Sequence, residues 1–271
     1  AGCEELYPFE LSGGMRKRGM TVHEGAHPVR VNGEDGHVVS VTIRLESGEE
    51  VDLPTDFVFL GTGERPLVQQ AQEALGIEVN DAGRVVVNKR MQSSVPGVYA
   101  AGDCTEIPHG LTRVPLQGLT GSHAYAQGKT AGVNAGGGRR TDSAVYVPWG
   151  TAAGKWIIGG ASFGETTATA LGIPYVVGTA QGISRARYYP GVKPVKVKLL
   201  AQPGSLRLLG AQMVGGEGIK ERADFLAMAV KFGFTLHDLA RMENVYSPAI
   251  GALNEPIVVA AQSGLDAVSK N

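Results

Sequence analysis

A short apolar segment that ends at a glycine and a carboxylate lies near the middle of this chain. Val98–Ala101 contains only small, apolar and aromatic residues, which predicts a short buried strand, and Gly102–Asp103 follows it directly. Glycine lacks a Cβ atom and lets a ligand approach the backbone, while a carboxylate at the carboxyl end of a strand can bind hydroxyl groups. The pattern fits the sugar-like part of a nucleotide, and it also fits an ordinary strand that ends in a turn.

Composition limits the classes of function that are open to the chain. Its 271 residues are enough for two domains, and its 43% hydrophobic and 19% charged residues are typical of a soluble globular protein. The net charge of −1 predicts no binding of nucleic acid or of an anionic membrane surface. No apolar run reaches the ~20 residues that cross a bilayer, and no leader pattern surrounds Glu4 and Glu5, so we expect a cytoplasmic protein without a membrane span.

The two cysteines, Cys3 and Cys104, lie far apart in the sequence and form neither a CxxC pair nor a metal-ligand spacing. We therefore expect no metal site and a reducing compartment. We interpret Cys104 as a small packed residue rather than a redox centre. Cys3 has no environment that the sequence identifies.

The first half of the chain alternates strand and turn patterns. Val38–Leu45 alternates apolar and polar residues, and Phe57–Leu60 is a continuous apolar run that predicts a strand buried on both faces. Small residues fill Pro115–Asn134, which predicts a helix packed closely against a backbone or a flat ligand. Gly136–Arg140 is rich in glycine and predicts a linker.

The second half has the pattern of an α+β domain. Val195–Leu200 alternates apolar residues with Lys196 and Lys198, so we expect a strand with one solvated face. Lys220–Phe232 carries apolar residues at helical spacing. Together these patterns predict a sheet with helices on one side.

One motif points to a different class of protein. Tyr7–Arg18 resembles the signature motif of ABC-transporter ATPases. That class also requires an upstream phosphate-binding loop and a downstream apolar strand that ends in Asp-Glu, and no GxxxxGK[ST] sequence occurs in the chain. The start of a surface helix is the better interpretation.

Two motifs together resemble those of the FAD-dependent pyridine nucleotide–disulfide oxidoreductases. Thr62 and Gly63, with Pro66, resemble the segment where that family's chain returns from the NAD domain to the FAD domain. Gly102 and Asp103 resemble the strand end that contacts the flavin. The similarity is greatest to the branch of NADH oxidases, coenzyme A-disulfide reductases and persulfide reductases.

This resemblance implies FAD and NAD(P)H as cofactors and assigns residues to the flavin site. Asp103 would hydrogen-bond the ribityl chain, next to Gly102. The helix that begins at Pro115, Leu116 and Gln117 would point its N-terminus at the pyrimidine edge of the flavin.

The resemblance also assigns a residue far downstream. Tyr246–Ser247–Pro248 is similar to a motif of the coenzyme A-disulfide reductase branch, in which a tyrosine reaches the active site of the partner subunit. Tyr246 is therefore expected to be a catalytic residue in a homodimer. The alternative is a tyrosine that is simply buried at an interface. We do not expect His237, which lies nearby, to act as an acid.

The implied fold class is α/β and α+β, the end of a two-dinucleotide-binding-domain flavoprotein fold followed by an α+β dimerisation domain. Residues 1–60 would be the end of the NAD(P)-binding domain, residues 61–140 the C-terminal part of the FAD-binding domain, and residues 145–271 the dimerisation domain.

The family's two GxGxxG fingerprints and its redox-active cysteine have no match in this sequence. We therefore expect the C-terminal portion of an FAD-dependent NAD(P)H oxidoreductase, an enzyme that passes electrons to a disulfide, a persulfide or dioxygen. The alternative is a non-catalytic dimerisation or scaffold subunit, which would need a separate chain to carry the nucleotide-binding motifs.

Overall fold

The computed structural model describes residues 8–116 and 121–270. Cys3 and Gln117 therefore lie outside the described residues. The chain divides into two compact units, one formed by Ser12–Arg65 and the other by the rest of the described chain. Helix α1 (Pro8–Arg16) begins the described chain.

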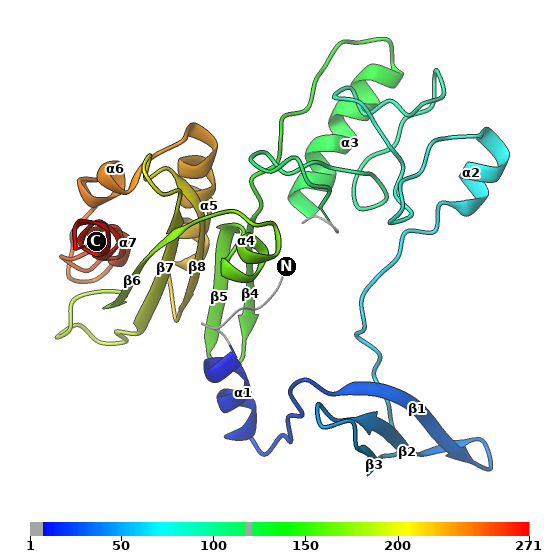
Figure 1. Cartoon of the computed structure of the whole chain (residues 1–271), viewed down its shortest axis with the longest axis horizontal. Coiled ribbons are helices and arrows are strands. Elements are labelled where there is room, and N and C mark those ends of the chain that lie inside the picture. Colours follow the sequence, from blue (N-terminus) through cyan, green and yellow to red (C-terminus); the bar gives the residue numbers. More distant parts are fainter. Residues whose placement is uncertain (1–7, 117–120, 271) are drawn as a thin grey trace. The chain divides into compact units, whose positions relative to one another are not determined.

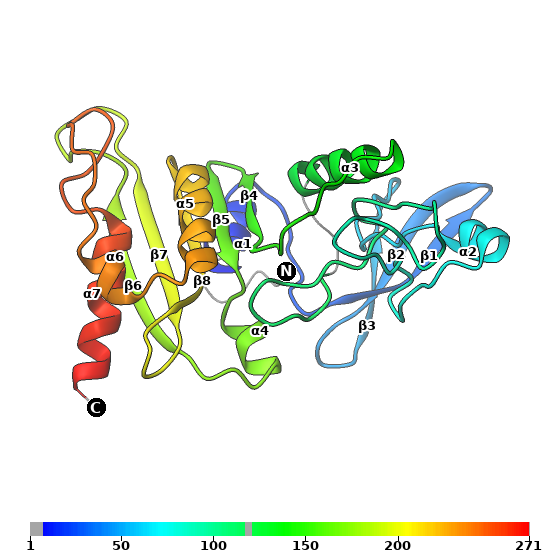
Figure 2. The same cartoon turned by 90° about the horizontal axis from the view of Figure 1, so that it is seen from above.

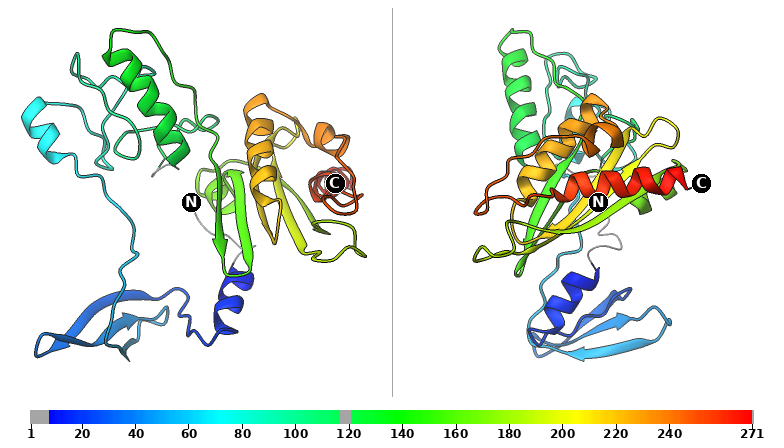
Figure 3. Two further views of the ribbon diagram at one scale, coloured as in Figure 1. Left: turned by 180° about the vertical axis from the view of Figure 1, so that it is seen from behind. Right: turned by 90° about the vertical axis from the view of Figure 1, so that its left-hand side faces the viewer.

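The unit of residues 12–65 contains a small antiparallel sheet with the strand order β1-β2-β3, drawn in blue in Figure 3. Its strands are β1 (His27–Glu34), β2 (His37–Arg44) and β3 (Glu50–Pro54). Asp35 and Gly36 join β1 to β2 with φ values of 51° and 81°, as a tight hairpin turn requires. Strand β2 confirms the prediction from the alternating pattern at this place.

Phe57–Leu60 does not form the predicted buried strand. No strand among the described residues pairs with it, and Phe57, Phe59 and Leu60 are 75%, 86% and 69% exposed. An apolar run becomes a strand only where neighbouring strands supply hydrogen bonds and both faces are covered. The described part of this chain provides neither for this segment.

The described residues between 66 and 140 form two helices, α2 (Gln69–Leu75) and α3 (Gly121–Ala135), with long irregular segments around them (Figure 1). Val98–Ala101 does not form a strand of a sheet. Within the described chain its only strand-like pairing is one isolated bridge between Tyr99 and Gln92. The described part of α3 starts later than the predicted Pro115. Side-chain packing nevertheless gives this region a small core, formed by Val68, Ile77 and Val85 with partly buried Val98, Ala100 and Cys104 at its edge.

The last part of the chain is a five-stranded antiparallel sheet with the order β4-β5-β8-β7-β6. Its strands are β4 (Pro148–Ala153), β5 (Trp156–Ser162), β6 (Val176–Ile183), β7 (Pro194–Ala201) and β8 (Leu208–Gly215). Helices α5 (Ile219–Phe232), α6 (Leu236–Ala240) and α7 (Pro256–Ser269) follow. Helix α5 packs on β5 and β8, and α7 packs on β6 and β7 (Figure 2).

Successive side chains of β7 point to opposite faces of the sheet. Val195, Val197 and Leu199 pack in one core with Leu226 of α5 and Ala260 of α7. These side chains become fully buried, and each contributes about 1.5–3 kcal/mol of hydrophobic stabilisation. This arrangement confirms the predicted α+β class.

The opposite face of β7 is not solvated, and the helices lie on both faces of the sheet rather than on one side, contrary to both predictions. Helix α4 (Glu165–Ala170) covers it, where Leu200 packs with Phe163 and Ala168. Lys198 is only 8% exposed because its ammonium group forms an ion pair with Glu165 of α4. A buried lysine is accommodated when its charge is paired, so the alternation of lysines did not mark a surface.

Candidate functional site

The Gly102–Asp103 turn is fixed by its contacts with α3. Gly102 has a φ of 84°, in the left-handed region that favours glycine, and a Cβ atom there would lie 3.3 Å from Ala124 Cβ. Its N–H donates to Gln127 Oε1 over 2.8 Å. The glycine therefore allows the close approach of the turn to the helix.

Asp103 presents an exposed side chain on this fixed backbone. Arg84 Nε donates to the carbonyl of Asp103 over 3.2 Å, and Thr105 Oγ1 donates to the carbonyl of Gly102 over 2.7 Å. A carboxylate with a fixed backbone can accept hydrogen bonds from the hydroxyl groups of a polyol.

An unsatisfied donor lies next to this turn. Gln127 is 1% exposed, and its Nε2 has no hydrogen-bond partner among the described residues, although Oε1 of the same amide accepts from Gly102. Buried amides normally make hydrogen bonds, so this group is a candidate for a contact with a bound molecule. The chemistry of Asp103 and Gln127 together fits the hydroxyl and carbonyl groups of a flavin cofactor.

The remaining predicted cofactor residues fall into two groups. Pro115 and Leu116 precede α3, and Leu116 N donates to the carbonyl of Ile107 over 2.9 Å. Thr62 and Gly63 belong to the unit of residues 12–65, where Gly63 has a φ of 105°. The predicted residue Gln117 lies outside the described residues.

Tyr246 lies beside a second tyrosine that sequence analysis missed. Its side chain is hydrogen bonded to that of Tyr188, in the loop between β6 and β7, and this hydrogen bond raises the pKa of Tyr188. Tyr246 is 47% exposed and Tyr188 is 77% exposed in the single chain. Nothing in the sequence links the two positions, because only the folding of the sheet brings their loops together.

The two tyrosines line a cavity of about 560 Å³ at the end of the sheet. Arg187, Gln181 and Asn254 supply its polar side chains, and the rest of its wall is largely apolar. Such a mixture of apolar wall and few polar groups is typical of small-molecule sites.

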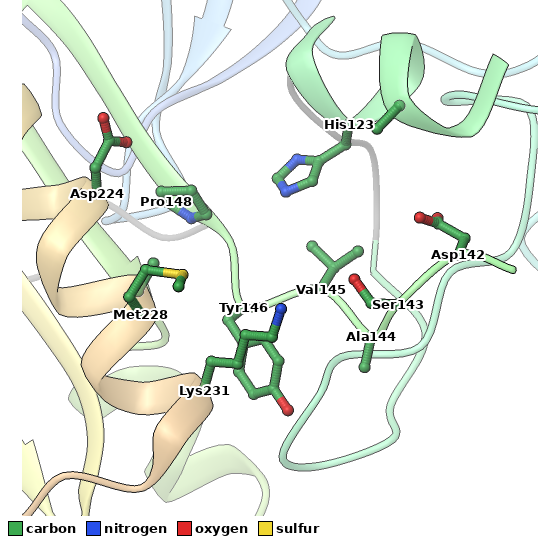
Figure 4. A pocket seen from close by; sticks show the side chains of 12 residues that line it. His123, Asp142, Ser143, Ala144, Val145, Tyr146, Pro148, Asp224, Met228 and Lys231 are labelled. Carbon is green, nitrogen blue, oxygen red and sulfur yellow. The ribbon is translucent and has the colours of Figure 1, made fainter. Parts of the chain in front are cut away.

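A further cavity, of about 330 Å³, lies between α3 and α5. His123 of α3 points its ring into this space, and Met228 and Lys231 approach from α5 (Figure 4). Burial lowers the pKa of His123, whereas the charge of Asp142 raises it. Neither Asp103 nor Tyr246 lines this cavity, so it is separate from both predicted sites.

Cys104 packs at the edge of the small core, where its Sγ lies 3.4 Å from the carbonyl oxygen of Ala101. This position agrees with its interpretation as a packed residue. In the part of the chain that the structure describes, no group of three or more histidine, cysteine and acidic residues is arranged to hold a metal ion. The same part contains no helix long and apolar enough to cross a membrane.

Comparison with known families identifies the family of the chain. The model described as "Pyridine nucleotide-disulphide oxidoreductase" matches residues 10–128, and the model of that family's dimerisation domain matches residues 155–256. The chain belongs to the pyridine nucleotide-disulphide oxidoreductase family. Strands β5 to β8 and helices α4 to α6 lie within the dimerisation-domain match, whereas β4 precedes it and α7 begins at its last residue.

Individual relatives in this family are oxidoreductases. The chain is 35% identical over 219 residues to an NADH oxidase of Methanocaldococcus jannaschii. The alignment covers 79% of this chain and 47% of the relative. It is 32% identical over 239 residues to an NAD(P)H coenzyme A polysulfide/persulfide reductase of Pyrococcus horikoshii, with coverages of 82% and 51%. The chain thus spans about half the length of the curated relatives that it matches.

A solved structure supports the fold over nearly the whole chain. The NAD-dependent persulfide reductase from A. fulgidus matches 95% of this chain and 47% of its own, with a TM-score of 0.87 and 28% identity. The family and the fold class expected from the sequence are therefore confirmed.

Proposed function

We propose that this chain is the C-terminal portion of an FAD-dependent NAD(P)H oxidoreductase that reduces a disulfide, a persulfide or dioxygen. The observation that carries the proposal is the cavity in the dimerisation domain that Tyr188 and Tyr246 line together. The names of the relatives, an NADH oxidase and persulfide reductases, support the same class of acceptor. When bound, FAD supplies the chemistry that accepts a hydride from nicotinamide and passes electrons on.

In this proposal the Gly102–Asp103 turn holds part of the cofactor. The Asp103 carboxylate accepts hydrogen bonds from ribityl hydroxyls, and Gln127 Nε2 donates to an acceptor next to Gly102. Thr62, Gly63, Pro115, Leu116 and Gln117 complete the cofactor contacts that this chain supplies. The protein groups orient the flavin and exclude water from it.

The tyrosines would serve the acceptor rather than the cofactor. Reduction of one disulfide by two electrons from NAD(P)H gives two thiols and consumes protons. Tyr188 has a raised pKa and stays protonated at neutral pH, so the pair can donate a hydrogen bond or a proton to a sulfur or oxygen anion that forms on the acceptor. We propose that Tyr246 does so in the site of a second copy, in a homodimer built on the dimerisation domain.

A second candidate is a scaffold subunit that pairs with a separate chain. The exposed segment with Phe57, Phe59 and Leu60 favours it, because an additional sheet would cover these apolar side chains. Retention of FAD by the protein would contradict a pure scaffold.

The proposed role of the tyrosines is tested with phenylalanine variants of the FAD-loaded protein. Tyr246→Phe and Tyr188→Phe are expected to lower kcat/KM for a disulfide or persulfide acceptor by ~10²-fold, because a positioned proton donor is lost. Tyr175→Phe is the matched control, since the Tyr175 hydroxyl contacts Thr169 on α4 and Tyr175 is not among the residues that line the cavity. Full activity of both test variants would refute the role.

A further inference from the structure

Two ion pairs connect the tyrosine-bearing loops to the start of α5. Arg185, three positions before Tyr188, forms an ion pair with Glu217, which directly precedes the N-cap of α5. Arg222, in the first turns of α5, pairs with Glu255, at the end of the loop that carries Tyr246. One short segment of the chain therefore contacts both loops.

The Arg185 contact holds a loop that is closed at its base. Ser184 N donates to the carbonyl of Lys193 over 2.8 Å, and Lys193 N donates to Ser184 Oγ over 3.0 Å. The Arg185 side chain is 21% exposed, and its Nε is buried without a partner in the described chain. Glu217 is thus the group that balances the charge of this guanidinium.

The Arg222 contact is bidentate and largely buried. Arg222 Nε and Nη2 donate to the two carboxylate oxygens of Glu255 over 2.6 and 2.8 Å, and the two side chains are 13% and 12% exposed. Glu255 Oε1 also accepts from the N–H of Ile257, which caps α7. Bidentate pairs of this kind fix orientation as well as distance.

The start of α5 has a backbone suited to these contacts. Gly218 has a φ of 70°, and a Cβ atom there would lie 2.3 Å from Arg222 Nη1, so a side chain would displace the guanidinium. Arg222 Nη1 donates to the carbonyl of Gly218 over 3.0 Å. One backbone hydrogen bond also joins the two tyrosine-bearing loops directly. Ala186 N donates to the carbonyl of Pro248 over 3.1 Å.

We propose that the segment 217–222 is a common support that holds the two loops so that the hydroxyls of Tyr188 and Tyr246 meet. Glu217 and Arg222 are then positioning residues for a tyrosine pair that they do not touch. This inference rests on the proposed function for the catalytic relevance of the pair. Removal of either residue leaves an uncompensated, partly buried charge on a loop, which moves the loop toward solvent.

The test follows the hydroxyl of Tyr188 in the full chain without any substrate. Protein labelled with ¹³C at the tyrosine ζ carbon is titrated with alkali by NMR, and Tyr188→Phe assigns the resonance. In Glu217→Gln and in Arg222→Gln, the pKa of Tyr188 is expected to fall toward its ordinary value, because the hydrogen bond to Tyr246 is lost. Asp224→Asn is the control, since it breaks an exposed ion pair with Lys220 on the same helix and should leave the titration unchanged.

A raised pKa of Tyr188 that persists in both folded test variants would overturn the proposal. If either variant fails to fold, the paired variant Arg185→Met/Glu217→Gln or Arg222→Met/Glu255→Gln replaces it. The paired variants break the same contact without leaving an uncompensated charge, so a raised pKa that persists in a folded paired variant has the same meaning. With FAD-loaded protein, the test variants are also expected to lose ~10- to 100-fold in kcat. A lowered pKa with unchanged kcat would uphold the support and refute instead the proposed role of the tyrosines.

Discussion

His109 Nε2 lies 3.1 Å from Ser162 Oγ, and both side chains are buried. Nδ1 of the same ring accepts from the N–H groups of Leu111 and Thr112 over 3.2 and 3.4 Å. Because Nδ1 is an acceptor, the neutral ring carries its proton on Nε2 and donates it to Ser162. This hydrogen bond connects the loop that follows Asp103 to β5 of the dimerisation domain.

We predict that His109 makes the stability of the protein depend on pH. Burial lowers the pKa of His109 from 6.5 to about 4. Between these values the unfolded chain binds more protons than the folded chain, so stability falls as the pH drops from about 6.5 to about 4 and then levels off. The shift corresponds to a loss of about 3 kcal/mol. Urea unfolding at several pH values measures it.

A variant that cannot titrate provides the comparison for this prediction. In His109→Gln the amide can still donate to Ser162, so the acid-dependent loss should largely disappear. His237→Gln, which changes an exposed histidine, should keep the pH dependence of the wild type. An equal loss of stability on acidification in wild type and His109→Gln would assign the effect to other groups.

The ion pair of Lys198 with Glu165 gives a prediction for stability at neutral pH. Its side chains are 10% and 22% exposed, so Glu165→Gln removes a negative charge that lies against a buried ammonium group. We expect a loss of about 3 kcal/mol in the free energy of unfolding. Asp224→Asn removes the exposed partner of Lys220 and should cost about 0.5 kcal/mol or less. Similar losses in both variants would contradict the assignment of Lys198 to a buried face.

Sequence patterns predicted elements whose stability comes from local periodicity. The apolar spacing of Lys220–Phe232 gave α5 with its correct face, and the alternation of Val38–Leu45 gave β2. Phe57–Leu60 has an equally clear pattern and still forms no strand, because a buried strand depends on partners that the described chain does not provide. Lys198 gave the opposite error. Its place in the alternating pattern predicted a solvated face, but the residue is buried and paired with Glu165 of α4.

The candidate site was predictable only where motif and chemistry coincide in a short segment. Gly102 and Asp103 are adjacent, and the positive φ of the glycine follows from the turn that the pattern implies. The pairing of Tyr188 with Tyr246, and the two ion pairs at the start of α5, join positions that are distant in the sequence. Such contacts depend on the order of strands in the sheet, which local patterns do not encode.

The most direct test of the central claim, that this chain holds part of an FAD site through Asp103, is cofactor retention. The purified full chain is mixed with FAD and passed through gel filtration, and the visible absorbance of the protein peak is recorded. We predict that flavin absorbance travels with the protein and that Asp103→Asn weakens binding by ~10- to 100-fold, as expected for the loss of a hydrogen bond to a charged group. Asp81→Asn, an exposed change in a nearby turn, should retain flavin. A protein peak without flavin, or equal retention by Asp103→Asn and wild type, would contradict the claim.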